Sequence, residues 1–259
     1  MPYAKPRVPR IYQPAGAPDY WALMNAPGKT HAQDAGDVAD LTGRTASGVR
    51  SPGCTWTTGP NGQRPRFDGT GGTVTVTGLA PQTGSFAVTL RFKPESYGNN
   101  ALIIQYGGNW RILFYPPGGN VLSFQFINTV FHVNSLTAPS LSSEHFLACY
   151  YDAGASQIGI SLDGGAFATA ACGAPAVNAG QLIISHSSLP YTGAIDDIRI
   201  FRRAPTPAEF ASIYADPYWR LREPSRIARI AAALTSPPTT ATTARPGRWV
   251  PTSYRRISR

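Results

Sequence analysis

The sequence contains little cysteine and no long apolar run. Three of its 259 residues are cysteine, and they stand at wide spacing with no CxxC pair: Cys54, Cys149 and Cys172. An odd number at such spacing argues against a disulfide framework and a cysteine-bound metal, so we expect three free thiols. No apolar run approaches the roughly 20 residues of a membrane span. The opening MPYAKPRVPR lacks the apolar stretch of a secretion signal, so we expect neither a membrane anchor nor an export signal.

Glutamate and histidine are also scarce, which bears on catalysis. Glycosidases hold two carboxyl groups on either side of the bond that they break. The chain has four glutamates, of which Glu209 lies in a helix cap and Glu223 lies toward the C-terminal end. The four histidines show no spacing typical of a metal site or a catalytic triad, and no nucleophile motif or phosphate-binding loop is found. We therefore predict that the chain is not an enzyme, and we expect no cofactor.

Positive charge is concentrated at the two ends of the sequence. The formal net charge is +9, of which residues 1–12 contribute +3 and residues 220–259 contribute +8, whereas residues 13–219 carry −2. Both ends are also rich in proline and have too few apolar residues to form a core. The distribution predicts a nearly neutral folded body between two basic arms.

The central part of the chain has the pattern of an antiparallel sandwich. In SFAVTLRFKP, apolar residues alternate with residues that are mostly polar, which is typical of a half-buried strand. The 26 glycines and 24 prolines supply turn residues between such segments. The same alternation occurs in NWRILFY, VLSFQF, HFLACYYD and QIGISLDGG. Short strands joined by tight turns predict two packed antiparallel sheets.

Two helices are predicted after these strands. Thr206-Pro207-Ala208-Glu209 forms a capping box with proline at the first helical position, and an apolar stripe follows at Phe210, Ile213 and Tyr214. A weaker helical candidate spans residues 224–236 and would place its apolar and basic residues on different faces. This second segment is predicted to be a small amphipathic docking helix.

Five stretches occur in the order seen in one superfamily: GPNGQRPRFDGTGGTVTV, SFAVTLRFKP, EHFLACYYDAGASQIGISLDGGAF, GQLIISH and YTGAIDDIRIFRRAPTPAEFASIY. Over about 35–216 the chain resembles the laminin-G-like, concanavalin A-like lectin/glucanase superfamily, although the E-x-D-x-x-E pattern of the related glucanases is not found. The resemblance implies an all-β, two-sheet antiparallel jelly-roll sandwich, with functions from glycan binding to protein adhesion to glycan hydrolysis. We expect this sandwich at 21–219, ending in one short helix, between extended arms at 1–20 and 220–259.

Two adjacent aspartates, Asp196 and Asp197, lie inside an apolar strand pattern. In domains that resemble this one, such carboxylates accept hydrogen bonds at turns and strand ends, and this is the interpretation that we favour. Some relatives bind calcium at loop ends, so the pair is also a weak calcium candidate. No dense acidic loop accompanies it, which limits the number of oxygen ligands.

Aromatic residues beside amide groups form a candidate glycan site. Carbohydrate sites stack sugar rings on aromatic side chains next to hydrogen-bonding groups. The aromatic residues that fit this description are Tyr106, Trp110, Tyr115 and Tyr151, flanked by Asn99, Asn100 and Asn109. From these we predict a glycan site at Tyr106, Asn109, Trp110 and Tyr151. Trp110 falls in phase with Ile112 and Phe114, however, so packing in the core is the favoured alternative for this residue.

The basic arms favour a role in assembly. The stretch YADPYWRL resembles sequences of virion proteins in tailed bacteriophages. We predict a non-enzymatic structural protein of a phage virion, assembled in the host cytoplasm. It would decorate or cement the capsid, with the tail as the less favoured location, and would display its lectin-like sandwich outward. Its arms would bind the major capsid protein or neighbouring copies through Arg7, Arg10, Arg226, Ile227, Arg229, Ile230, Leu234, Arg248, Trp249, Tyr254, Arg255 and Arg256.

A second hypothesis makes the chain a carbohydrate-binding adhesin, or an accessory module of a glycan-degrading system. Its partner would then be a glycan, for instance on a host surface. Nucleic-acid binding by the arms is the least favoured alternative, and no membrane partner is expected.

Overall fold

The computed structural model describes residues 20–22, 37–38, 48–60, 62–79, 82–98, 100–115, 120–127, 131–176 and 180–215, with the backbone alone at 20–22, 37–38 and 62–63. The chain divides into two units, 1–221 and 222–259, and all described residues belong to the first. The predicted docking helix at 224–236 therefore lies outside the described residues. So do the predicted assembly residues: Arg7, Arg10, Arg226, Ile227, Arg229, Ile230, Leu234, Arg248, Trp249, Tyr254, Arg255 and Arg256.

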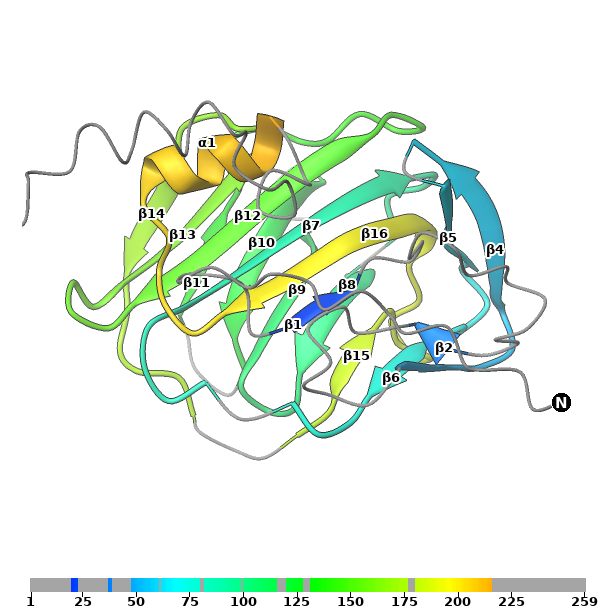
Figure 1. The fold of residues 1–259 in the computed structure, drawn as a ribbon, viewed down its shortest axis with the longest axis horizontal. Coiled ribbons are helices and arrows are strands. Elements are labelled where there is room, and N and C mark those ends of the chain that lie inside the picture. The colour runs from blue at the N-terminus through cyan, green and yellow to red at the C-terminus, as the bar shows by residue number, and fades with distance from the viewer. Residues whose placement is uncertain are drawn as a thin grey trace, which may run out of the picture. The chain divides into compact units, whose positions relative to one another are not determined.

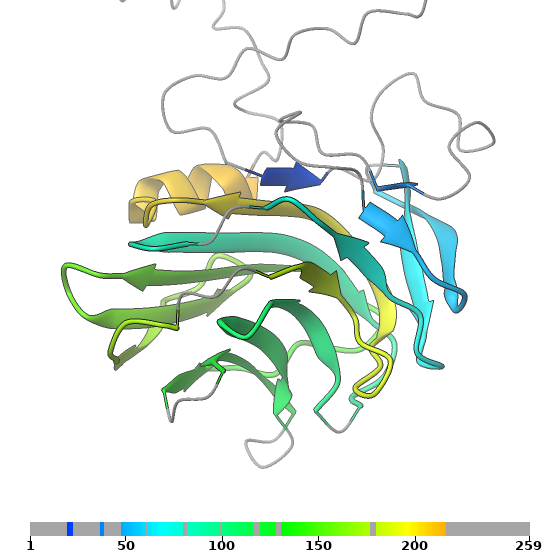
Figure 2. The same cartoon turned by 90° about the horizontal axis from the view of Figure 1, so that it is seen from below.

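The described strands form two antiparallel sheets that face each other (Figure 1 and Figure 2). Sheet A contains, in spatial order, β14 (Ala168–Ala171), β13 (Gln157–Leu162), β12 (His145–Asp152), β7 (Phe86–Pro94), β16 (Thr192–Phe201), β5 (Gly62–Asp68) and β4 (Cys54–Gly59). Sheet B contains β11 (His132–Asn134), β10 (Val121–Phe126), β9 (Trp110–Tyr115), β8 (Leu102–Tyr106), β15 (Leu182–Ile184), β6 (Val74–Val76), β3 (Gly48–Arg50) and β2 (Asp37–Val38). This arrangement confirms the predicted jelly-roll sandwich.

Strand β16 is central to sheet A. It pairs along one side with β7, and on its other side residues 192–194 pair with β5 while residues 198–200 pair with β1 (Tyr20–Ala22). Strand β1 thus begins at the last residue of the predicted N-terminal arm. Because β16 contacts three strands, its side chains come close to groups from distant parts of the sequence.

The core lies between the two sheets. Every second residue of β7 from Phe86 to Phe92 is fully buried in it. Burying such a side chain stabilises the fold by roughly 1.5–3 kcal/mol. Ala87 and Thr89, on the opposite face of β7, are buried as well, although the alternation predicts a polar and exposed face there. They are covered because β12, β16 and the helix α1 place further side chains on the outer face of sheet A.

Helix α1 spans Pro207–Ala215 and packs on the outer face of sheet A (Figure 2). Thr206 and Glu209 form the predicted capping box, since the Thr206 N–H donates to Glu209 Oε2 at 2.9 Å and the Glu209 N–H donates to Thr206 Oγ1 at 3.3 Å. Phe210 and Ile213 are buried against residues of β7, β12 and β16. No helix among the described residues is long and apolar enough to cross a membrane.

The three cysteines are free, as predicted, and all three are buried. Burial raises the pKa of the Cys54 thiol to about 11, with a smaller opposing effect from Arg50. Burial also raises the pKa of Cys149 well above its usual value.

Candidate functional site

A β-bulge in β16 explains the position of the two aspartates. Asp196 pairs with Arg91 of β7 and Arg199 pairs with Thr89, so the register shifts between them. Asp197 adopts the left-handed backbone conformation, with φ of 51°. The Asp197 N–H donates to Asp196 Oδ1 at 2.8 Å. The bulge turns the carboxylate of Asp197 toward Arg199 on the outer face of sheet A.

Asp197 forms a buried ion pair with Arg199. The Arg199 guanidinium donates to both carboxylate oxygens, at 2.8 and 2.9 Å, and each residue is 1% exposed. The Nε of Arg91 lies 3.7 Å from Asp197 Oδ2. The favoured interpretation of Asp197 as a hydrogen-bond acceptor therefore holds, although it accepts within a strand rather than at a strand end. The geometry does not favour the calcium role, because guanidinium groups occupy the space beside the carboxylate and the described residues contain no cluster of three or more His, Cys, Asp or Glu.

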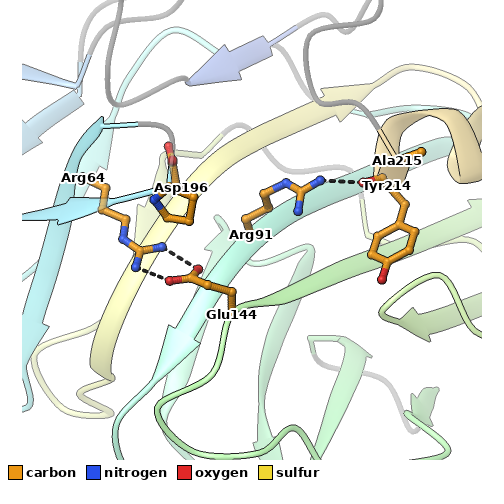
Figure 3. Close-up of a pocket in the computed structure, with 7 residues that line it drawn as sticks. Arg64, Arg91, Glu144, Asp196, Tyr214 and Ala215 are labelled. Carbon is orange, nitrogen blue, oxygen red and sulfur yellow. Dashed lines mark hydrogen bonds and ion pairs between the residues drawn. The ribbon is translucent and has the colours of Figure 1, made fainter.

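A polar pocket lies next to this bulge on the outer face of sheet A (Figure 3). Its volume is about 220 Å³, and it is lined by Pro60, Arg64, Arg91, Glu144, Asp196, Tyr214 and Ala215. Strands β5, β7 and β16 supply Arg64, Arg91 and Asp196, whereas Glu144 directly precedes β12. The pocket thus combines charged groups from three neighbouring strands and from the residue before β12 with the C-terminal end of α1.

Arg64 and Glu144 form a bidentate ion pair at the pocket. Arg64 Nη1 donates to Glu144 Oε2 at 2.6 Å, and Nη2 donates to Oε1. Arg64 is 3% exposed, whereas Glu144 is 38% exposed. Burial opposes the charge of the guanidinium, but the hydrogen bonds and charge of Glu144, together with the charge of Asp196, raise the pKa of Arg64 above its usual value. Gly59 provides the room for this arginine, because a Cβ at Gly59 would lie 2.6 Å from Arg64 Nε.

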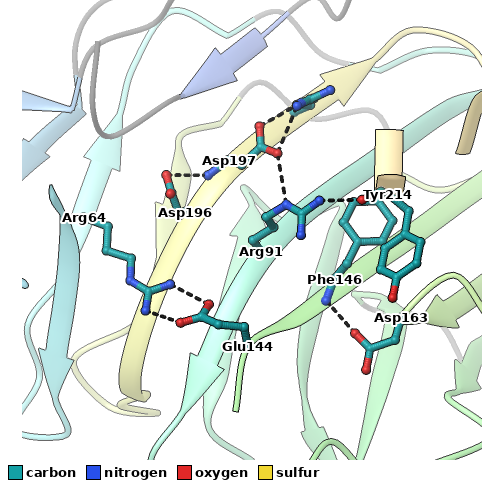
Figure 4. Close-up of polar contacts among 9 residues, drawn as sticks. Arg64, Arg91, Glu144, Phe146, Asp163, Asp196, Asp197 and Tyr214 are labelled. Atoms are coloured by element: carbon teal, nitrogen blue, oxygen red, sulfur yellow. Dashed lines mark hydrogen bonds and ion pairs between the residues drawn. The ribbon is translucent and has the colours of Figure 1, made fainter. Parts of the chain in front are cut away.

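Arg91 and Tyr214 form the opposite side of the pocket (Figure 4). Arg91 Nη2 donates to the Tyr214 carbonyl at 2.7 Å, and the guanidinium lies over the Phe146 ring, 5.4 Å from its centroid. The Tyr214 ring packs against Phe146 with centroids 5.5 Å apart and is 40% exposed. An exposed aromatic ring therefore stands beside the charged groups.

The four residues predicted to bind a glycan are not at this pocket. Tyr106, Asn109, Trp110 and Tyr151 are all buried, none more than 4% exposed. Tyr106 donates to the Leu79 carbonyl at 2.8 Å, and the Trp110 ring stacks on Phe86 with centroids 5.8 Å apart. The rings of Tyr106, Trp110 and Tyr151 face the space between the sheets, so no sugar can stack on them in this structure. The alternative for Trp110, packing in the core, is confirmed.

Sequence reasoning did not find Arg64 and Glu144. They are separated by 80 positions and come together only through the order of strands in sheet A. One signal was present, because Arg64 and Arg66 alternate around Pro65 and so predict a basic face on β5. The outer face does carry a second bidentate pair, in which Arg66 donates to Glu95 at 2.9 and 2.5 Å.

The structure also brings together Ser140, His145 and Asp163, although the histidines show no triad spacing in the sequence. His145 Nδ1 lies 2.7 Å from Asp163 Oδ2, and Nε2 lies 2.9 Å from the Ser140 carbonyl and 3.2 Å from Ser140 Oγ. A carbonyl only accepts, so the shorter contact requires a proton on Nε2. The imidazole then cannot take a proton from Ser140, and it ties the loop before β12 to the turn after β13.

The comparisons with known proteins agree with this fold. Residues 68–211 match the concanavalin A-like lectin/glucanases superfamily. Among solved structures, domain 4 of AbnA, an extracellular arabinanase from Geobacillus stearothermophilus solved with arabinotriose, aligns with a TM-score of 0.60 and 15% identity over 77% of this chain and 98% of that one. The binding domain of botulinum neurotoxin DC, solved with SialylT, aligns with a TM-score of 0.55 and 14% identity over 75% of this chain and 50% of that one.

Trypanosoma rangeli sialidase aligns with a TM-score of 0.59 and 10% identity over 84% of this chain, which spans 36% of the sialidase chain. No curated protein matches the sequence. At these identities the solved structures are similar in fold alone. The sequence match covers more than half of the chain, from the end of β5 into α1, and shows that this protein belongs to the concanavalin A-like lectin/glucanases superfamily.

Proposed function

We propose that this chain is a non-catalytic carbohydrate-binding module and that the polar pocket of sheet A binds the sugar. The observation that carries the proposal is the convergence of the Arg64–Glu144 pair and Asp196 beside the exposed ring of Tyr214. Sugar hydroxyls both donate and accept hydrogen bonds, and the apolar face of a sugar ring packs on aromatic side chains. Similar folds in the arabinanase domain solved with arabinotriose and in the toxin domain solved with SialylT support this proposal.

The contacts of the pocket carboxylates favour binding over hydrolysis. Each oxygen of Glu144 already accepts an N–H from Arg64, so this carboxylate is not arranged to donate a proton as a general acid. Asp196 accepts from a backbone N–H, which likewise stabilises a carboxylate acceptor. Glycoside hydrolysis needs one of two facing carboxyl groups to carry a proton.

A glycan array with the full chain, followed by titration calorimetry of the best ligand, tests this function. The Tyr214→Ala variant should weaken binding about tenfold, because it removes the exposed ring at the pocket. Tyr115→Ala is the matched control, since Tyr115 makes a similar ring contact with His132 at 6.0 Å on sheet B. An array without specific binding, or equal losses in the two variants, would contradict the proposal.

A role as a virion structural protein is a second proposal, supported by the sequence alone. The +3 and +8 charges of the chain ends favour arms that bind an acidic neighbour. Genes for a major capsid protein and a portal beside the coding gene would support a capsid location in a virion assembled in the host cytoplasm. A neighbouring glycosidase gene would instead favour the accessory-module hypothesis.

A further inference from the structure

We infer that the polar pocket selects a neutral sugar unit over an acidic or an amino sugar. This inference rests on the proposed function and adds the chemical class of the ligand. The similar folds do not decide this class, because one was solved with arabinotriose and another with SialylT. The charges in the pocket of this chain indicate the chemical class of the ligand.

The charged groups that line the pocket cancel. Arg64 and Arg91 are opposed by Glu144 and Asp196, and among the described residues no further charged side chain lines the pocket. Directly beside it, Asp197 and Arg199 neutralise each other. A ligand carboxylate would add an uncompensated negative charge near Glu144 and Asp196. A ligand ammonium would add an uncompensated positive charge beside the two arginines. A neutral ligand brings no such cost.

Three of the four Nη atoms of the two arginines already donate to protein acceptors. Both Nη atoms of Arg64 donate to Glu144, and a ligand carboxylate could take this bidentate place only by expelling that side chain. Arg91 Nη2 is held by the carbonyl of Tyr214. Hydroxyl groups, in contrast, can donate to the remaining lone pairs of Glu144 without breaking either contact.

The size of the pocket limits the part of the ligand that it encloses to one sugar ring. Its volume of about 220 Å³ is below the roughly 300–1,000 Å³ of sites for drug-sized molecules. The pocket therefore has room for one hexose or pentose unit, with the Tyr214 ring at its edge.

Matched pairs of oligosaccharides test the inference on the full chain by titration calorimetry. Oligomers of glucose and galactose are compared with oligomers of glucuronate and galacturonate. We expect neutral members to bind at least about tenfold more tightly than their acidic counterparts. Glu144→Gln removes one negative charge with little change in shape. It should lower the ratio of the affinity for the neutral oligomer to the affinity for the acidic oligomer about tenfold.

Glu95→Gln is the matched control, because Glu95 makes the same kind of bidentate pair with Arg66 on the same face and does not line the pocket. Its ratio should equal that of the unchanged chain. If Glu144→Gln does not fold, Asp196→Asn makes the same charge change and should give the same shift. Preference of the unchanged chain for acidic oligomers would overturn this inference but not the proposed function. Equal shifts of the affinity ratio in the Glu144 and Glu95 variants would do the same. Failure of every glycan on the array to bind would overturn the proposed function as well.

Discussion

Arg64 and Glu144 form an ion pair that spans two intervening strands of sheet A. Arg64 belongs to β5 and Glu144 precedes β12, with β16 and β7 between them. The pair therefore crosses the outer face above the bulge and fixes one wall of the pocket. Because Arg64 is almost fully buried while Glu144 is partly exposed, the two partners contribute unequally to stability.

Glu144→Ala should lower the free energy of unfolding by about 1–3 kcal/mol, because it leaves the buried Arg64 without its carboxylate. Glu95→Ala, which removes the partner of the more exposed Arg66, should change it by about 0–1 kcal/mol. Urea denaturation of both variants measures the difference. Equal effects would show that the burial of Arg64 has no energetic consequence.

Gly59→Ala should weaken glycan binding without unfolding the chain. A Cβ at this position would meet Arg64 Nε, Cδ and Cζ at 2.6–2.9 Å, so the flexible guanidinium must move and take Glu144 with it. Gly84→Ala is the control, since a Cβ there meets nothing within 4 Å. Calorimetric titration should show a loss of about tenfold or more for Gly59→Ala only, with melting temperatures close to that of the unchanged chain.

Asp197→Ala should be the most destabilising change at the bulge, by about 3–5 kcal/mol, because it removes the bidentate carboxylate partner of the buried Arg199. The double variant Asp197→Ala, Arg199→Met should recover part of this loss, since it also removes the buried positive charge. A double-mutant cycle by chemical denaturation measures the coupling. Additive effects would contradict a buried ion pair.

The sequence predicted the fold better than the site. Alternation in segments such as SFAVTLRFKP and the capping box at Thr206 identified strands and helix, because both signals are local. The pocket depends on strand order, which places Arg64 beside Glu144 and has no local signature. The composition around Trp110 suits sugar binding and so predicts a glycan site there. The alternation of side chains along the strands instead places these aromatic rings in the core. For Trp110, the phase argument was the correct one.

The three thiols should resist modification in the folded chain. Burial raises the pKa of Cys54 to about 11, so at pH 8 roughly one molecule in a thousand carries the reactive thiolate, and this fraction rises as the pH approaches that value. A chromogenic disulfide reagent should react slowly with the native protein and with three thiols after denaturation. Fast reaction of one thiol in the native state would contradict its burial.

Deleting residues 222–259 should separate the two proposed functions. All described residues that line the pocket lie between Pro60 and Ala215, and the contact pattern divides the chain after Leu221. Residues 1–221 should therefore fold and bind the same glycan with unchanged affinity. The deletion removes +7 of the formal charge. Binding to an acidic assembly partner should therefore be lost, because many weak arginine contacts act together in such an arm. Calorimetry with the glycan and co-sedimentation with purified capsids measure the two activities. Retained glycan binding with lost co-sedimentation would support both proposals, whereas glycan binding that disappears with the arm would contradict a sugar site formed by the described pocket residues alone.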